Sequence, residues 1–596
     1  MKTLLKKTLI IARRCSVNFK PILHSQPRDS FKSNITINQN IMNTKNCEDL
    51  IQIVGSTLQK MNMINLCTSF NVLLKFQNNL ISNPNRISFL GNLLDRTYDL
   101  AFNLPFSEYN ARPLSNLYFF FNKLIENKAV FSQVETFNDL SIKINMILEK
   151  KIPVMIENMN DQEISNVIYT LAQRKKIDNI IAMNDLIIQK FQNYSFKSNL
   201  MIFYSYSSLD INVPAVYKGL DEWFIKNIKL QKINGHDFSQ LIFAYSKINN
   251  IITESKIFDY FNQTHVFLYN EINILSLSTI FHALTRFQKP LMSKEFYEKY
   301  QAKIIENMHN LNDRMLSNIL RGFGKWNYGT DSFYIKMEGK CIERCEFLDY
   351  KIYSSILHSY ATNLKGSFKL YEVFEKNFLK RMEKNGGSDF TNNNLLYIFY
   401  SFTHIKETYP CSNETKEFFK NIFIQRMDDL NMDELAPITA MYSTFIKENQ
   451  PFFLSLTKLL LKKQIPIAKI KNLAEITKSY ALHASSLYDK DLIDYFSMNL
   501  ANVLEKEAES KKSLSTFKDR DFFNHLAKTL FSFLKYEPIR NYSDIYQKVA
   551  NLMEEMCSLN SENATVLFQE PSILFFFKQS FAKMNIKHEF LLKYES

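Results

Sequence analysis

LSNILRGFGKW, from Leu316 to Trp326, is the clearest copy of a motif that recurs along this chain of 596 residues. With Leu316 counted as position 0, apolar residues fall at positions 0, 3, 4 and 7, which is the spacing of one buried face of an α-helix. Position 6 is glycine in this copy and is small in almost every other copy. A small residue lets a neighbouring helix approach closely, so the motif predicts helices packed side by side.

The motif returns at nearly regular intervals. Its copies begin at Leu114, Ile164, Asn199, Phe238, Leu277, Leu316, Tyr353, Leu395, Leu435, Leu473 and Leu526, with a weaker copy from Leu66. From Ile164 to Leu473 the starts are separated by 35, 39, 39, 39, 37, 42, 40 and 38 residues. A more charged helical segment, such as SKEFYEKYQAKIIENM from Ser293, lies between copies. This regularity is typical of repeat proteins.

The predicted repeat unit is therefore helix, turn, helix. One unit cannot bury its apolar stripe alone, whereas stacked units share a continuous core. We predict an all-α fold, an α-solenoid of stacked helix-turn-helix repeats of about 37–40 residues. In four copies an acid stands just ahead of the stripe, as a helix cap or first-turn acid: Asp161, Asp237, Asp313 and Asp433.

The sequence contains no pattern that indicates catalysis or a cofactor. It has no phosphate-binding loop, dinucleotide-binding, zinc-protease or nucleophile-elbow motif, so we predict that the chain is not an enzyme. Cys341 and Cys345 would share one helix face. No second Cys or His pair completes zinc-finger spacing, so we predict no metal site. No apolar run approaches the roughly 20 residues that a membrane span needs.

The first 28 residues contain seven Lys or Arg and no acid, with apolar residues mostly on one side of a helix. Such a start is typical of a mitochondrial transit peptide and predicts location in the mitochondrial matrix, with a disordered basic tail as the alternative. Residues 1–32 contribute +7 of the formal net charge of +13, which leaves +6 for the rest of the chain. That balance does not by itself indicate nucleic-acid binding.

We accordingly divide the chain into four segments. Residues 1–32 form the transit peptide, 33–160 irregular helical repeats, 161–485 the regular array, and 486–596 a C-terminal helical region with a charged insertion from Leu504. Within the second segment we expect residues 33–60 to be a poorly ordered lead into the array.

The side of the first helix that the apolar stripe leaves open varies from copy to copy. Positions 5 and 9 lie one turn apart on that side, and aromatic residues, Arg, Lys and His alternate there. Aromatic rings stack on the bases of single-stranded RNA while cations bind its phosphates. The candidate RNA-binding residues are Tyr169, Gln173, Tyr204, Phe243, Lys247, His282, Arg286, Arg321, Lys325, His358 and Tyr400.

A structural role for the same residues is the alternative. Position 9 is near the end of its helix, where cations are favoured by the helix dipole, and rings at position 5 can pack against the next repeat. The densest part of the row is His282, Arg286, Arg321 and Lys325. The basic triplet Arg174–Lys176 either extends this row or is a solvated turn.

Three stretches, LSNILRGFGKW, LSTIFHALTRF and ISNVIYTLAQRK, resemble the core of octotricopeptide and heptatricopeptide repeats. Those repeats also form the helical part of the FAST kinase-like and RAP-domain proteins of mitochondria and chloroplasts. The resemblance covers about residues 160–540 and implies binding of single-stranded mitochondrial mRNA or rRNA, in RNA stability, processing or translation. The C-terminal RAP domain of that family has no visible counterpart, because residues 540–596 are predicted to be further helix.

A second function remains open on the same fold. The modest charge of the array and the missing RAP domain also suit a structural or assembly subunit of a large mitochondrial complex, either the mitoribosome or a respiratory assembly. In that case the solenoid would be a scaffold that binds other proteins.

Deletion of residues 1–28 tests the targeting prediction. The shortened protein, expressed with a C-terminal fluorescent tag, should stay in the cytosol because the basic amphipathic segment is gone. Fluorescence microscopy and mitochondrial fractionation report its location, and the full-length fusion is the control. Arrival of the shortened protein in mitochondria would contradict the prediction.

Overall fold

The computed structural model describes residues 28–76, 84–104, 111–126, 135–230, 233–248, 255–264, 268–446, 449–483, 490–511, 520–534, 546–547, 549–551 and 571–584. Within these ranges the chain forms helices joined by turns and contains no strand, which confirms the predicted all-α class. The chain divides into two compact units, Met1–Phe296 and Tyr297–Ser596, here called unit 1 and unit 2. Their boundary falls within residues 161–485.

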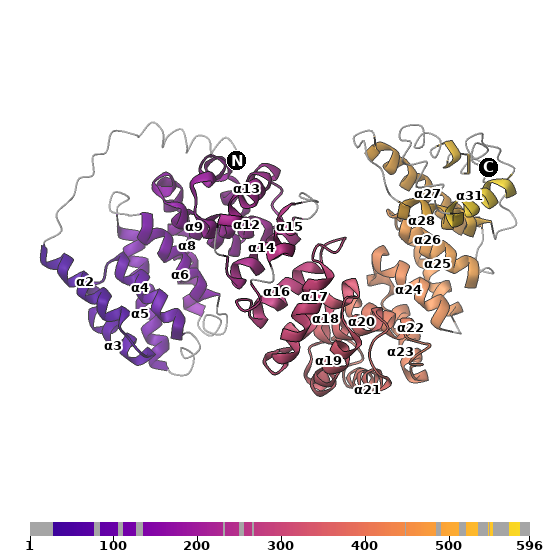
Figure 1. Ribbon diagram of the computed structural model, residues 1–596, viewed down its shortest axis with the longest axis horizontal. Helices are drawn as coiled ribbons and strands as arrows, with labels where there is room; N and C mark the ends of the chain where they lie inside the picture. The colour runs from indigo at the N-terminus through magenta and orange to yellow at the C-terminus, as the bar shows by residue number, and fades with distance from the viewer. Residues whose placement is uncertain are drawn as a thin grey trace. The chain divides into compact units, whose positions relative to one another are not determined.

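The helices that carry the motif, here called first helices, pack one after another in a single layer within each unit (Figure 1). In unit 1 they are α4 (Met63–Leu73), α6 (Ala111–Ile125), α9 (Asp161–Gln173), α12 (Phe196–Ser208), α14 (Gly235–Lys247) and α16 (Ile274–Leu284). In unit 2 they are α18 (Asp313–Trp326), α20 (Tyr350–Thr362), α22 (Asn392–His404), α24 (Met432–Phe445), α26 (Ile470–His483) and α28 (Arg520–Phe533). The end helices α2 (Arg28–Met42) and α31 (Pro571–Lys583) pack against α4 and α28, respectively.

The second helices form a separate row in each unit. In unit 1 they are α3 (Cys47–Thr57), α5 (Pro84–Asn103), α8 (Glu135–Met155), α10 (Ile177–Ile181) with α11 (Asn184–Lys190), α13 (Pro214–Asn227) and α15 (Ile257–Thr264). In unit 2 they are α19 (Asp331–Arg344), α21 (Phe368–Asn385), α23 (Asn413–Gln425), α25 (Gln450–Lys463) and α27 (Lys490–Lys511). Helix α17 (Lys294–Glu306) contains the boundary between the units.

Short 3₁₀ turns end many of the second helices and lead the chain back to the next first helix. They are η1 (Leu58–Lys60), η4 (Ile156–Asn158), η5 (Phe191–Asn193), η6 (Ile228–Leu230), η7 (Met308–Asn310), η8 (Cys345–Phe347) and η9 (Met427–Asp429). A tight turn of this kind satisfies carbonyls that the end of an α-helix leaves open.

Asparagine, rather than aspartate, begins several of the first helices. The side chains of Asn160, Asn234, Asn312 and Asn431 each accept a hydrogen bond from the backbone N–H three residues further on. The acids predicted as caps or first-turn acids are therefore first-turn acids, where the helix dipole favours them.

The small residue at position 6 is buried in the first-helix layer, as the motif predicts. Where it is serine, its hydroxyl donates to the carbonyl four residues earlier in the same helix, for example from Ser205 to Met201 at 2.6 Å and from Ser401 to Tyr397 at 2.6 Å. This internal bond satisfies the hydroxyl without a partner on the next helix. A Cβ on the buried Gly324 would lie 3.3 Å from the carbonyl oxygen of Ser359, so this glycine also serves close packing.

Cations of the second helices tie neighbouring repeats together. Arg381 of α21 donates to three carbonyls in the turn that ends α19, at 3.0, 3.1 and 2.9 Å. Arg426, the C-cap of α23, donates at 2.7 Å to each of two carbonyls after α21, and Arg96 of α5 donates to two carbonyls after α3. Lys151 of α8 binds the end of α5 in the same way. Each cation satisfies carbonyls at a helix end, where its charge also suits the dipole.

The expectation that residues 33–60 form a poorly ordered lead is wrong. These residues belong to α2, α3 and η1. Ile37 and Ile41 of α2, and Leu50 and Val54 of α3, recur at helical spacing and are buried, and the Asn65 side chain donates to the Asn34 carbonyl at 2.9 Å. This segment is thus another helix pair of unit 1. In the part of the chain that the structure describes, no helix is both long and apolar enough to cross a membrane.

Substitution of Ser205 tests the packing role of position 6. Ser205→Leu should destabilise unit 1 by about 1–3 kcal/mol because the buried site has no room for the larger side chain, whereas Ser205→Ala should cost less than about 1 kcal/mol. Hydrogen exchange of the α9, α12 and α14 amides, followed by mass spectrometry, measures the difference. Equal effects of the two substitutions would show that close helix approach is not the constraint.

Candidate nucleic-acid interface

Five rings at position 5 form a continuous line across the first helices of unit 1. The line, here called the aromatic row, runs from α6 through α9, α12 and α14 to α16 and consists of Phe119, Tyr169, Tyr204, Phe243 and His282. Successive ring centroids are 5.7, 6.4, 5.6 and 6.4 Å apart, and the last three pairs lie within 35° of parallel. Phe119 is buried, and the other four side chains are half-buried.

The sequence-based candidates omitted the first ring of this row and its cation. Phe119 and Lys123 stand at positions 5 and 9 of the copy that begins at Leu114, so the same count would have found them. The ammonium of Lys123 lies 4.5 Å from the centroid of the Phe119 ring and 5.8 Å from that of Tyr169. Both distances are those of a cation–π contact.

The two predicted cations of unit 1, Arg286 and Lys247, differ in the number and strength of their contacts beside the row. The Arg286 guanidinium lies 4.9 Å from the Phe243 ring centroid, donates to the Ser246 hydroxyl at 3.3 Å and contacts Nε2 of His282 at 3.1 Å. Lys247 is 3.8 Å from a carboxylate oxygen of the exposed Asp210, which is a weak pair in water. Arg286 therefore contacts the row directly, whereas Lys247, whose side chain is 24% exposed, is held only by this weak pair.

The two tyrosines of the row remain neutral hydrogen-bond donors. Burial raises the pKa of Tyr169 to about 12, with smaller contributions from Glu126 and Tyr204, and a side-chain hydrogen bond with Gln173 opposes the shift. Burial also raises the pKa of Tyr204, against the positive charge of Arg286. Gln173, at position 9 of α9, is exposed.

The candidates of unit 2 form a smaller group on α18, α20 and α22. The His358 ring centroid lies 5.0 Å from that of Tyr400, which stacks on His404 at 5.2 Å. Tyr397, at position 2 of α22, adds a half-exposed ring 4.7 Å from His358, and the sequence-based candidates omitted it. Lys325 is exposed, with its ammonium 5.3 Å from the Trp326 ring centroid.

His358 is not one of the cations of this group. Burial lowers its pKa to about 4, and the positive charges of Arg321 and His404 act in the same direction. At neutral pH the imidazole is uncharged and offers a flat ring, so Arg321 and Lys325 carry the positive charge on this side of unit 2. The dense group predicted from the sequence is divided between the units, because His282 and Arg286 belong to unit 1.

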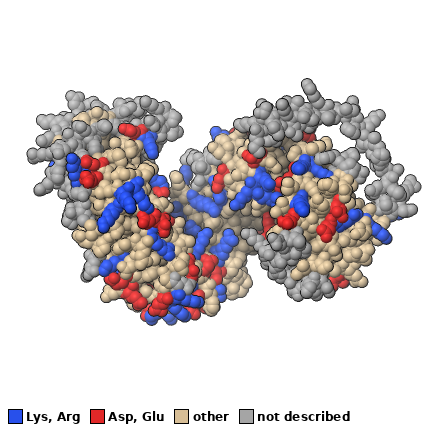
Figure 2. Space-filling view, turned by 180° about the vertical axis from the view of Figure 1, so that it is seen from behind, with Lys and Arg blue, Asp and Glu red and all other residues tan. Residues whose placement is uncertain are grey.

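Positive and negative side chains are intermixed on one face of the described surface. On the face drawn in Figure 2, blue Lys and Arg side chains lie beside red Asp and Glu side chains in many places. Local arrangement, rather than net charge, therefore decides where an anion would bind.

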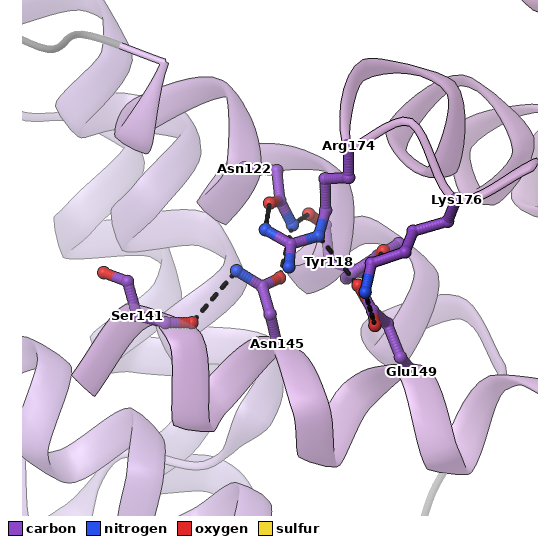
Figure 3. Close-up of polar contacts among 7 residues, drawn as sticks. All are labelled: Tyr118, Asn122, Ser141, Asn145, Glu149, Arg174 and Lys176. Atoms are coloured by element: carbon purple, nitrogen blue, oxygen red, sulfur yellow. Dashed lines mark hydrogen bonds and ion pairs between the residues drawn. The ribbon is translucent and has the colours of Figure 1, made fainter. Parts of the chain in front are cut away.

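Arg174 and Lys176 of the basic triplet do not extend the row, because both pair with Glu149, whereas Lys175 is exposed in the turn after α9. Glu149 of α8 accepts from Arg174 Nε at 2.7 Å and pairs with Lys176 at 3.2 Å, and the Tyr118 hydroxyl donates to the same carboxylate at 3.1 Å (Figure 3). Arg174 also donates to the side-chain oxygen of Asn122 at 3.3 Å. Glu149 thus links α8 to Tyr118 of α6 and to the end of α9. Its carboxylate is largely buried, so the loss of either cation would leave a buried charge poorly paired.

Comparisons with known proteins place the chain in no family. No family model matches it, and no curated relative matches it. Among solved structures it is similar to the pentatricopeptide repeat protein PPR10 from maize (10% identity, 98% of this chain and 96% of that chain, TM-score 0.27) and to She4p (12% identity, 97% and 95%, TM-score 0.27). PPR10 in complex with an 18-nt psaJ RNA element matches at 10% identity over 96% of this chain and 97% of that chain, with a TM-score of 0.25. Likeness at these TM-scores carries no argument about function.

Acidification tests the state of His358. Its pKa is about 4 in the folded chain against about 6.5 when exposed, so the unfolded state binds the proton more tightly and stability falls as the pH drops below 6.5. Between pH 7 and pH 5 the loss should be about 2 kcal/mol in unit 2. Hydrogen exchange of the α20 and α22 amides measures it, and His358→Gln should remove most of this pH dependence. An unchanged pH dependence in His358→Gln would show that His358 is not buried and neutral.

Proposed function

We propose that this chain binds single-stranded mitochondrial RNA along its first helices and acts in RNA stability, processing or translation, not as an enzyme. The observation that carries the proposal is the aromatic row of unit 1 with Lys123, Lys247 and Arg286 beside it. The row joins helices from five repeats, so a ligand that follows it must be extended.

The chemistry of this surface suits a single strand of nucleic acid. Cations beside the rings attract phosphates, and the edges of the rings can contact bases. Both kinds of group lie together along the first helices of unit 1. Arg321 and Lys325 beside the rings of His358 and Tyr400 present the same combination in unit 2.

The mitochondrial part of the proposal rests on the N-terminal segment. Residues 1–27 of the basic, acid-free stretch lie outside the described residues, and α2 begins at Arg28. A mitochondrial matrix protein with this surface would meet mRNA and rRNA. The resemblance of the motif to the octotricopeptide, heptatricopeptide and FAST kinase-like repeats supports the same assignment.

A scaffold in a mitochondrial complex is the second candidate, and one observation favours it. Unit 2 exposes large apolar side chains on or beside its second helices: Ile335 on α19 is 69% exposed, Phe347 in η8 is 70% and Phe368 on α21 is 60%. Exposed apolar groups of this size suit contact with another protein, such as a subunit of the mitoribosome or of a respiratory assembly.

Crosslinking and sequencing of RNA bound to the protein in mitochondria tests the proposal. Arg286→Gln/Arg321→Gln/Lys325→Gln should lose most of the enriched RNA, because three cations beside the rings are neutralised while their side-chain stems are largely kept. The matched control is Lys218→Gln/Lys336→Gln/Lys369→Gln, which removes three exposed lysines of the second helices α13, α19 and α21.

The control should retain the enriched RNA at the wild-type level. Equal loss in both variants would show that only net charge matters. RNA enrichment that neither variant changes, or no enrichment with the wild type, would remove the first-helix surface as an RNA site and favour the scaffold.

A further inference from the structure

Neighbouring rings of the aromatic row are packed face against face. Tyr169 and Tyr204, Tyr204 and Phe243, and Phe243 and His282 are 5.6–6.4 Å apart between centroids, at interplanar angles of 22–35°. A base sandwiched between two rings needs them about 7 Å apart and parallel, which is twice the optimal contact distance. The row therefore presents the edges of its rings to a ligand, and the spaces between neighbouring rings are too narrow to bind a base.

Polar side chains beside the row are engaged within the chain. Base readout on single strands uses side chains that hydrogen-bond the edges of bases. Ser208, Ser246 and Thr279 donate their hydroxyls to carbonyls of their own helices, at 2.9, 2.7 and 3.1 Å. Asn166 is buried and donates to the Asn116 side chain at 3.2 Å. These groups are satisfied by the protein and do not form a series of base readers.

Amides beside the row are too few to read a run of bases. Gln173 on α9 interacts with Tyr169, and Gln240, at position 2 of α14, is half-buried. With the half-buried Asn116 at position 2 of α6, these amides stand on three of the five helices. Single amides can contact single bases but cannot define a sequence along all five helices. The other groups beside the row are the cations at position 9.

Those cations are spaced along the row. Lys123 stands on α6, Lys247 on α14 and Arg286 on α16, each one helical turn beyond a ring of the row. The phosphate backbone is identical for every sequence, so contacts of this kind give affinity without discrimination.

We propose that unit 1 holds single-stranded RNA by its phosphate backbone and does not discriminate among bases. This inference rests on the proposed function and specifies the ligand as single strands of any sequence. It differs from a one-base-per-repeat surface because each ring of the row is packed against the ring of the next repeat.

Equilibrium binding of the full chain to oligoribonucleotides of about 20 residues tests it, with uridine, cytidine and adenosine homopolymers at roughly 50–200 mM salt. Affinities for the three should agree within about threefold, because the phosphate backbone is the same in all of them. Lys123→Gln/Lys247→Gln should make the plot of log K against log salt shallower by about 1.4, since each lost phosphate contact contributes about 0.7. Lys123→Arg/Lys247→Arg keeps both charges and should keep the wild-type slope.

The outcomes separate the two claims. A preference of more than about tenfold for one homopolymer would overturn the inference, particularly if Gln240→Ala abolished that preference. A slope unchanged in Lys123→Gln/Lys247→Gln would overturn the assignment of phosphate contacts to unit 1. Failure of the wild type to bind any of the three RNAs at the lowest salt would instead overturn the proposed function itself.

Discussion

Close approach of neighbouring first helices is the constraint on which the rest of this structure depends. Most of these helices carry a small residue at position 6, with Phe120 on α6 and Met441 on α24 as exceptions. Serine suits the position because its hydroxyl bonds a carbonyl of its own helix. Position 5 lies next to position 6 in the chain. The same close approach that buries Ser205 therefore brings the ring of Tyr204 against the rings of Tyr169 and Phe243. The core and the aromatic row have one physical origin.

Cations in this protein divide into those that hold the repeats together and those that face solvent. Arg381 and Arg426 bind carbonyls at helix ends, and Arg174 and Lys176 share the carboxylate of Glu149. A cation paired with a carboxylate, as Arg174 and Lys176 are, contributes little to the attraction of a distant anion. Lys325 is exposed, and the partner of Lys247 is a weak one. A count of Lys and Arg does not distinguish these groups.

The aromatic row shows why the structural and functional interpretations of position 5 are not exclusive. Its rings pack against the next repeat, as the structural interpretation requires, and four of the five side chains remain half-buried rather than fully covered. Because the faces of the rings are packed together, only their edges and the nearby cations can contact a ligand. A strand bound there would be held by its backbone and by edge contacts, which suits binding that tolerates many sequences.

The sequence by itself determined the all-α class, the repeat and the burial of its apolar stripe, because helical periodicity is a local property that recurs in every copy. It also placed Tyr169, Tyr204, Phe243 and His282 at one register position, and an unbroken count would have added Phe119. Only the tertiary structure decided which cations are paired with a buried carboxylate and which are exposed. Arg174 and Lys176 meet Glu149 across some 25 residues of chain, and the boundary between the units falls in α17, between two copies of the motif whose spacing shows no break there. Such pairings depend on which side chains the stacked helices bring together. The sequence does not give the distance between side chains on different helices.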